Sequence, residues 1–91
     1  MAGSPVVRLN RAVAVAMAEG PAAGLDLVET LAASGELAGY HLVPATRADL
    51  LRRLRHSEEA AAAYREALEL VATDAERRYL VRRLAEVTNQ S

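Results

Sequence analysis

The chain has 91 residues, 52% of them hydrophobic, a net charge of −1 and no cysteine. This composition excludes disulfide bonds and thiolate metal sites, mildly favours a reducing compartment, and gives no overall positive field that would attract nucleic acid or acidic lipid. The length predicts one domain over residues 1–91, with residues 1–4 and 89–91 expected to be flexible. Phe and Trp are absent, so the core must be built mainly from Leu, Val and Ala, which suits closely packed helices.

Five helices and no strand are predicted, over residues 5–19, 21–33, 42–55, 57–71 and 74–88. Several helix ends carry recognisable signals. Ser4 followed by proline is typical of an N-cap and a first helical residue, and Gly20 followed by proline ends one helix and opens the next. Thr73 and Glu76 fit a capping box before the last helix. Pro44 must lie in the first turn of its helix, because further inside it would break a backbone hydrogen bond.

Residues 50–72 show the strongest pattern, two helices separated by a tight turn at residues 55–57. Ser57 is expected to be the N-cap of the second helix, where its hydroxyl can accept a hydrogen bond from a backbone N–H. The apolar stripe of that helix recurs at spacings of three and four, at Ala60, Tyr64, Ala67, Leu68 and Val71. Small residues at 60 and 67 allow a second helix to approach closely. This layout is typical of the tetratricopeptide (TPR) repeat, whose period is about 34 residues.

The two hairpins repeat one pattern at an offset of 36 residues. Gly24 then falls on Ala60 and Val28 on Tyr64, so that small residues match small and apolar residues match apolar. Gly24 is expected at a close helix crossing, with Leu27, Val28 and Leu31 inward. The sequence therefore predicts an all-α fold of TPR-like antiparallel hairpins, made of two repeats and a fifth helix, with its stripe at Leu80, Leu84 and Val87, that caps the second repeat.

Four segments together resemble one protein family: SPVVRLNRAVAVAMAEGPAAGLDLVETLA, LAGYHLVPATRADLLRRL, EEAAAAYREALEL and DAERRYLVRRLAEV. They are similar to the C-terminal TPR-like extension of a group of bacterial extracytoplasmic-function RNA polymerase sigma factors. The resemblance covers residues 4–87 and departs at Arg55, where the family usually has glycine. The promoter-melting and helix-turn-helix domains of complete sigma factors have no counterpart in these 91 residues.

The resemblance implies a regulatory domain that acts in transcription initiation through protein contacts, with sigma core domains or RNA polymerase as partners. The alternative is a free-standing TPR-like adaptor that binds a peptide or a protein tail. Under either interpretation the chain is not expected to be an enzyme, to need a cofactor, or to bind nucleic acid directly. No run of about 20 apolar residues and no secretory signal is visible, so a cytoplasmic location without membrane contact is expected.

Few residues suggest chemistry. His41 and His56 have no second His or Cys at metal-ligand spacing, and the carboxylates form no isolated pair of the kind acid–base catalysis needs. Arginines crowd two segments, at Arg52, Arg53, Arg55, Arg77, Arg78, Arg82 and Arg83. They are interpreted first as a solvated face, second as a site for an acidic partner, and third as a nucleic-acid contact.

A partner groove is predicted from the TPR layout, in which the first helix of each pair lines the concave side. Its positions on the first helix are Val6, Leu9, Val13, Ala16 and Met17, and on the third helix Leu42, Ala45, Asp49, Arg52 and Arg53. The first set is wholly apolar, so either a partner covers it or the fifth helix folds back over it. The expected groove has an apolar floor and an edge formed by Arg52 and Arg53, and it should prefer a segment that combines apolar residues with Asp or Glu.

Overall fold

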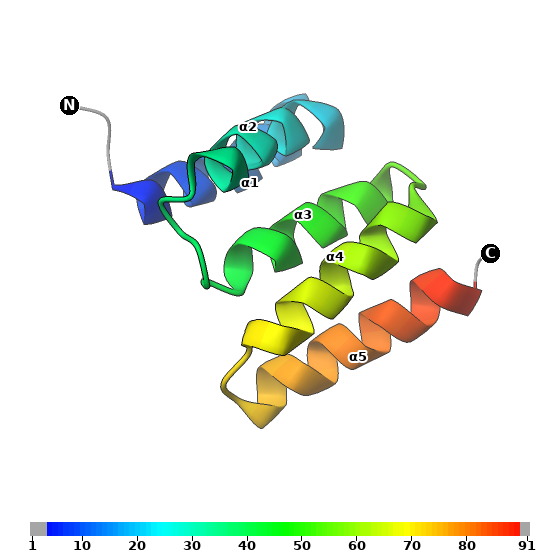
Figure 1. Cartoon of the computed structure of the whole chain (residues 1–91). Helices are drawn as coiled ribbons and strands as arrows, with labels where there is room; N and C mark the ends of the chain where they lie inside the picture. Colours follow the sequence, from blue (N-terminus) through cyan, green and yellow to red (C-terminus); the bar gives the residue numbers. More distant parts are fainter. Residues whose placement is uncertain (1–3, 90–91) are drawn as a thin grey trace.

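The computed structural model describes residues 4–89, and within them the chain forms five α-helices and no strand. The helices are α1 (Pro5–Glu19), α2 (Pro21–Ser34), α3 (Leu42–Arg53), α4 (Ser57–Leu70) and α5 (Asp74–Asn89). Each helix packs against the next one in the chain, and α1 also touches α3. Figure 1 shows α3, α4 and α5 side by side, with the α1–α2 hairpin stacked on the α3 side. The predicted all-α class with five helices is confirmed.

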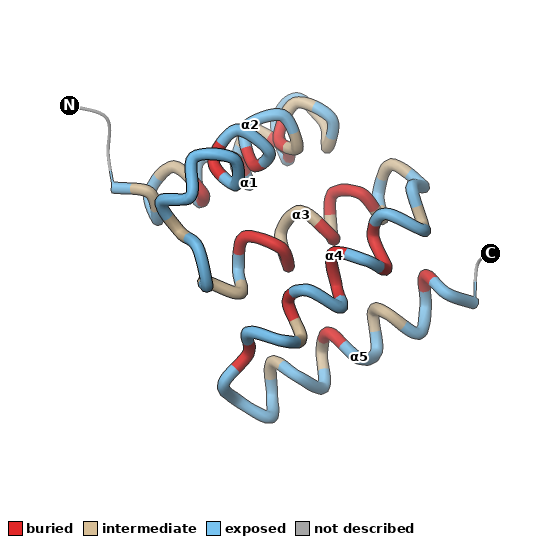
Figure 2. The backbone as a smooth tube through the Cα atoms, in the orientation of Figure 1, coloured by how far each residue is buried: buried red, intermediate tan, exposed pale blue. Residues whose placement is uncertain are grey.

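The core consists of two apolar clusters that meet at α3. Leu9, Val28 and Leu31 of the first hairpin pack with Val43 and Leu50 on one side of α3. The second cluster joins α3, α4 and α5, and its buried members include Ala48, Leu51, Ala60, Tyr64, Ala67, Leu80 and Val87. Figure 2 shows the buried segments concentrated on α3 and α4, because these helices have neighbours on both sides. Burial of this apolar surface is the main stabilising contribution.

The buried positions of α2 recur in α4 at the offset of 36 residues. Gly24, Val28 and Leu31 are the buried residues of α2, and their counterparts are among the buried residues of α4, namely Ala60, Tyr64 and Ala67. At Gly24 a Cβ atom would lie 2.5 Å from the Ala16 Cβ and 2.8 Å from the Ala12 carbonyl oxygen. The expectation of a close crossing at Gly24 is therefore confirmed, since no larger residue fits without backbone movement.

Most predicted helix ends are confirmed. The Ser4 hydroxyl accepts a hydrogen bond from the Val7 N–H at 3.3 Å. Gly20 ends α1 with a positive φ of 106°, and Pro44 lies in the first turn of α3. The Thr73 hydroxyl accepts from the Glu76 N–H at 3.3 Å. The Thr73 hydroxyl also donates to the Glu76 carboxylate at 2.7 Å. In a usual capping box that carboxylate would instead accept from the Thr73 backbone N–H.

The turn between α3 and α4 differs from the prediction. Ser57 is the first helical residue of α4, and His56 occupies the N-cap position without a side-chain hydrogen bond. Helix α3 ends at Arg53 and α4 at Leu70, two and one residues earlier than predicted. Arg55 has a φ of 66°, the left-handed conformation that glycine adopts without strain. The chain needs this conformation to reverse direction, and the preceding helix therefore stops before it.

One apolar residue that was predicted to point inward is exposed. Leu27 is 43% exposed, although its neighbours in α2 are buried as predicted. On α1, three of the five predicted groove positions, Val6, Val13 and Met17, are exposed, whereas Leu9 and Ala16 are buried. The buried side of α1 is formed by Leu9, Ala12 and Ala16. This side meets α2 and α3.

Two further properties concern only residues 4–89. No helix there is long and apolar enough to cross a membrane. No group of three or more His, Cys, Asp or Glu side chains among them is arranged to hold a metal ion. The expected flexibility of residues 1–3 and of 90–91 concerns residues outside the described part, whereas Ser4 caps α1 and Asn89 is the last residue of α5.

Candidate functional site

A cleft of about 320 Å³ runs between the first half of α3 and the first half of α5. It is lined by His41, Leu42, Ala45, Thr46, Asp49, Ala75, Glu76, Tyr79 and Leu80. Three positions of the predicted groove, Leu42, Ala45 and Asp49, therefore lie together on one wall. The other wall comes from α5, which sequence reasoning treated only as a cap. The floor of the cleft is apolar. The polar groups of the cleft belong to Asp49, Thr46, Glu76, His41 and Tyr79.

Asp49 connects three helices at the inner end of the cleft. Its carboxylate accepts a hydrogen bond from the hydroxyl of Tyr64 on α4. It also accepts one from the hydroxyl of Tyr79 on α5, whose oxygen lies 3.1 Å from Oδ2 and 3.3 Å from Oδ1. Because a buried tyrosine hydroxyl needs a polar partner, Asp49 satisfies two such groups at once. It therefore fixes α4 and α5 relative to α3.

Both tyrosine hydroxyls receive an arginine in the same way. Arg52 Nε donates to the Tyr64 oxygen at 3.1 Å, and Arg83 Nε donates to the Tyr79 oxygen at 3.4 Å. The Arg83 guanidinium also lies over the Tyr79 ring, 5.4 Å from its centroid, and donates to Glu86 at 2.9 Å. Each hydroxyl thus accepts from an arginine and donates to Asp49. The five side chains form one connected network across α3, α4 and α5.

Electrostatics stabilise the neutral form of Tyr64 and the charged form of Arg83 in this network. Burial raises the pKa of Tyr64, and its hydrogen bond to the Asp49 carboxylate raises it further. Hydrogen bonds to Tyr79 and Glu86 raise the pKa of Arg83. The Tyr64 hydroxyl consequently remains a donor and Arg83 remains charged, and together with Asp49 they form a fixed structural wall of the cleft.

The outer rim of the cleft is held by the start of α5. The hydrogen bond from the Thr73 hydroxyl is the largest cause that lowers the pKa of Glu76, and the nearby His41 lowers it as well. His41 Nε2 lies 2.5 Å from Glu76 Oε2, which makes an ion pair when the imidazole is protonated. This contact joins the residue before α3 to the first turn of α5 and closes the rim.

The remaining groove positions are not brought into this cleft. Leu9 and Ala16 lie in the core, and Val6, Val13 and Met17 are exposed on α1. Arg52 and Arg53 do not line the cleft, because Arg52 turns toward Tyr64 and Arg53 is exposed beyond it. The predicted edge of Arg52 and Arg53 therefore forms no part of the α3–α5 cleft. Folding back of α5 over α1 is also wrong, since α5 packs against α4.

The exposed row on α1 still matches the cleft wall on α3 in register. Val6 is the counterpart of Leu42, Val13 of Asp49 and Met17 of Arg53 at the offset of 36 residues. Helices α1 and α3 touch each other. Met17 is 77% exposed, the largest exposure of any bulky apolar side chain among residues 4–89. The apolar row on α1 thus occupies the repeat positions that correspond to the cleft wall on α3.

Tyr79 was missed by the sequence prediction, and Arg83 was named there only as one of the crowded arginines. Tyr79 lies on the flank of the Leu80–Leu84–Val87 stripe, and periodicity alone leaves it at the surface. The signal that could have found it is Asp49, a carboxylate among the apolar residues of α3. A carboxylate in that position needs donors from other helices, and the chain contains only three tyrosines.

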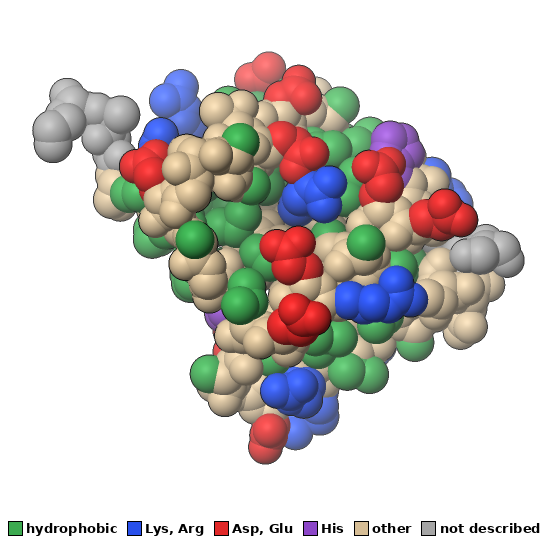
Figure 3. Space-filling model, in the orientation of Figure 1, with side chains coloured by type: hydrophobic (Ala, Val, Ile, Leu, Met, Phe, Trp, Pro, Cys, Tyr) green, Lys and Arg blue, Asp and Glu red, His purple; other side chains and the backbone are tan. Residues whose placement is uncertain are grey.

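Charges elsewhere on the surface are mixed. Arg8 pairs with Glu36, and Arg47 pairs with Glu29 across the α2–α3 boundary. On the face seen in Figure 3, arginine and acidic side chains are interspersed and form no continuous patch of one sign. This distribution favours the interpretation of the arginines as a solvated face on that side of the molecule.

Comparison with known proteins gives one similar sequence of unassigned function. An uncharacterized protein of Rhizobium meliloti (strain 1021) is 45% identical over 78 residues, which are 85% of this chain and 18% of that protein. The chain thus spans about a fifth of the length of the curated relative it matches. No family model matches the chain, and no solved structure matches it.

Proposed function

We propose that the chain is a TPR-like protein–protein interaction domain that regulates transcription initiation as the C-terminal part of a sigma factor. The observation that carries the proposal is the repeated hairpin: the four segments that resemble the sigma-factor extension form helices whose buried positions recur at 36 residues. The aligned region of the relative belongs to a much longer protein. That favours a module within a larger chain over a free-standing adaptor.

The partner surface in this proposal consists of the α3–α5 cleft and the exposed row on α1. Leu42 is partly exposed at the cleft mouth, and Ala45 and Leu80 form its floor. The two carboxylates of the cleft already have partners in Tyr64, Tyr79, Thr73 and His41. Recognition therefore depends mainly on apolar contact, and the occupant is an apolar helix or tail of the sigma core domains.

The test is a titration of separately prepared core domains of such a sigma factor into this domain. Leu42→Asp should weaken binding by about tenfold or more, because it places a charge in an apolar contact. Its melting curve should change little, since Leu42 is 39% exposed. Val81→Asp is the matched control, because Val81 is an exposed apolar residue on the far side of α5 and should leave binding unchanged.

A charge-reversal variant tests whether Arg53 contributes to partner binding. Arg53→Glu should weaken binding and make it less sensitive to salt if an acidic group of the partner lies beside Met17 and Arg53. Arg52 is unsuitable for this purpose because its reversal would also remove the hydrogen bond to Tyr64. Core domains that bind Leu42→Asp as tightly as the natural chain would contradict the proposal.

A further inference from the structure

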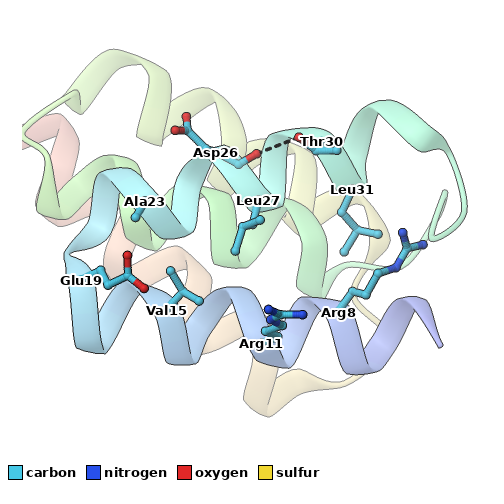
Figure 4. A pocket seen from close by; sticks show the side chains of 9 residues that line it. All are labelled: Arg8, Arg11, Val15, Glu19, Ala23, Asp26, Leu27, Thr30 and Leu31. Carbon is cyan, nitrogen blue, oxygen red and sulfur yellow. Dashed lines mark hydrogen bonds between the residues drawn. The ribbon is translucent and has the colours of Figure 1, made fainter. Parts of the chain in front are cut away.

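A second and larger groove lies between α1 and α2, on the side of the first hairpin away from α3. Its volume is about 540 Å³, and it is lined by Arg8, Arg11, Val15, Glu19, Ala23, Asp26, Leu27, Thr30 and Leu31. Figure 4 shows Val15 and Leu27 between the two helices, with Arg8 and Arg11 extending from α1. The α3–α5 cleft takes no part in it.

Comparison with the second hairpin shows that this groove lacks a covering helix. In the second hairpin the corresponding face is covered by α2: Val43 and Leu50 pack into the cluster formed with α1 and α2, and Arg47 pairs with Glu29 of α2. The counterparts on α1 are Val7, Arg11 and Ala14, and all three are exposed.

The groove floor gives the same result. Leu51 and Ala63 of the second hairpin are 2% and 1% exposed. Their counterparts are Val15, which is half-buried, and Leu27, which is 43% exposed. The same positions of one repeated structure are thus buried where a helix covers them and open where none does.

We propose that the α1–α2 groove binds an amphipathic helix of a partner protein that carries a carboxylate opposite Arg11. The carboxylate follows from the register, since Arg47, the counterpart of Arg11, is paired with Glu29. Arg8 is already paired with Glu36, whereas no carboxylate within residues 4–89 lies at ion-pair distance from Arg11. An arginine fork aimed at a carboxylate adds direction to apolar packing.

Charge also distinguishes this partner from a second copy of the chain. The exposed outer face of α5 is the surface that a second copy would present in head-to-tail stacking, and it carries Arg77, Arg78 and Arg82 around Val81. Placed in the groove, it would bring arginines toward Arg11 and Arg8. An α2-like helix, with Glu29 and an apolar side, has the complementary sign. Glu19 and Asp26 line the groove as well, so the carboxylate of the occupant belongs near Arg11 and away from these two residues.

The test attaches a helix of this chemistry to the whole chain. A copy of residues 21–41, which comprise α2 and its connection to α3, is placed directly before Val6. Because Val6 is the counterpart of Leu42, the copied helix should meet α1 in the same way as α2 meets α3. The melting temperature should rise by about 4–8 °C for a domain of this size. The chain has no natural cysteine, so Leu27→Cys reports directly on groove cover. Its labelling rate should fall at least about tenfold, while Val81→Cys, on the outer face of α5, should label at an unchanged rate.

Charge reversal supplies the matched control. Glu29→Arg in the copied helix should restore most of the Leu27→Cys labelling, and adding Arg11→Glu to that variant should suppress the labelling again. Unchanged labelling of Leu27→Cys in the extended chain would overturn the proposal, as would protection that ignores both reversals. Concentration-dependent protection of Leu27→Cys in the unextended chain would assign the groove to a second copy and overturn it too. No sigma factor is needed, so this result is independent of the proposed function.

Discussion

The two hairpins share one repeated pattern, and they differ in what covers them. The α3–α4 hairpin lies between α2 and α5 and buries residues on both of its sides. The α1–α2 hairpin meets α3 on one side and has an open groove on the other. Residues in matching positions thus belong to the core in one hairpin and to the surface in the other. In a stacked helical repeat, burial is a property of the neighbours as much as of the sequence.

The largest predicted difference compares Leu51 with its counterpart Val15. Leu51→Ala should cost about 2–5 kcal/mol of unfolding free energy, because it leaves a cavity in the covered second hairpin. Val15→Ala should cost less than about 1 kcal/mol, since Val15 is half-buried beside an open groove. Urea denaturation of the two variants measures both values. Equal losses would show that the two hairpins are covered alike.

The helix crossings should behave alike in both hairpins. Ala60→Leu should destabilise the protein by about 1–3 kcal/mol, because Ala60 is fully buried where α4 crosses its neighbour. Gly24→Ala adds a single carbon, yet it should also lower the melting temperature. The new Cβ would meet the Ala12 carbonyl oxygen, which no side-chain rotation can move away. An unchanged melting temperature for Ala60→Leu would show that the repeat register is wrong there.

The turn inside the second hairpin should become more stable with the glycine that the first turn already has. The first turn already has glycine at a positive φ, at Gly20, whereas the second uses Arg55. Arg55→Gly should stabilise the protein by about 1 kcal/mol by removing the steric cost of the left-handed conformation. The control Arg53→Gly, in the last turn of α3, should instead destabilise it by up to about 1 kcal/mol. Thermal melting of the two variants distinguishes a turn effect from a general effect of removing an arginine.

The smallest predicted effect depends on pH and concerns α5, the helix that covers the second hairpin. The pKa of Glu76 is lower in the folded protein than its ordinary value of 4.5, chiefly because of the Thr73 hydrogen bond. Its carboxylate therefore adds stability above about pH 4.5, and this contribution disappears as the pH falls through the lower folded pKa. The stability difference between the natural chain and Glu76→Gln, followed by denaturation from pH 7 to pH 3, should shrink in the acid range. A constant difference would contradict the role of the charged group.

The sequence by itself determined the helices, most of their ends and the residues at the close crossings. Periodicity, capping residues and small side chains act within a few residues of the chain, so Ser4, Gly20, Gly24 and Thr73 could be interpreted without a neighbour. Only the tertiary structure decided which flank of each helix is covered. Leu27 is exposed and Ala63 is buried because α2 packs against the second hairpin, whereas no described element covers the groove side of the first. The tertiary structure also determined where the cleft lies, because the network at Asp49 joins side chains from three helices. Local sequence patterns do not fix how helices far apart in the sequence are placed.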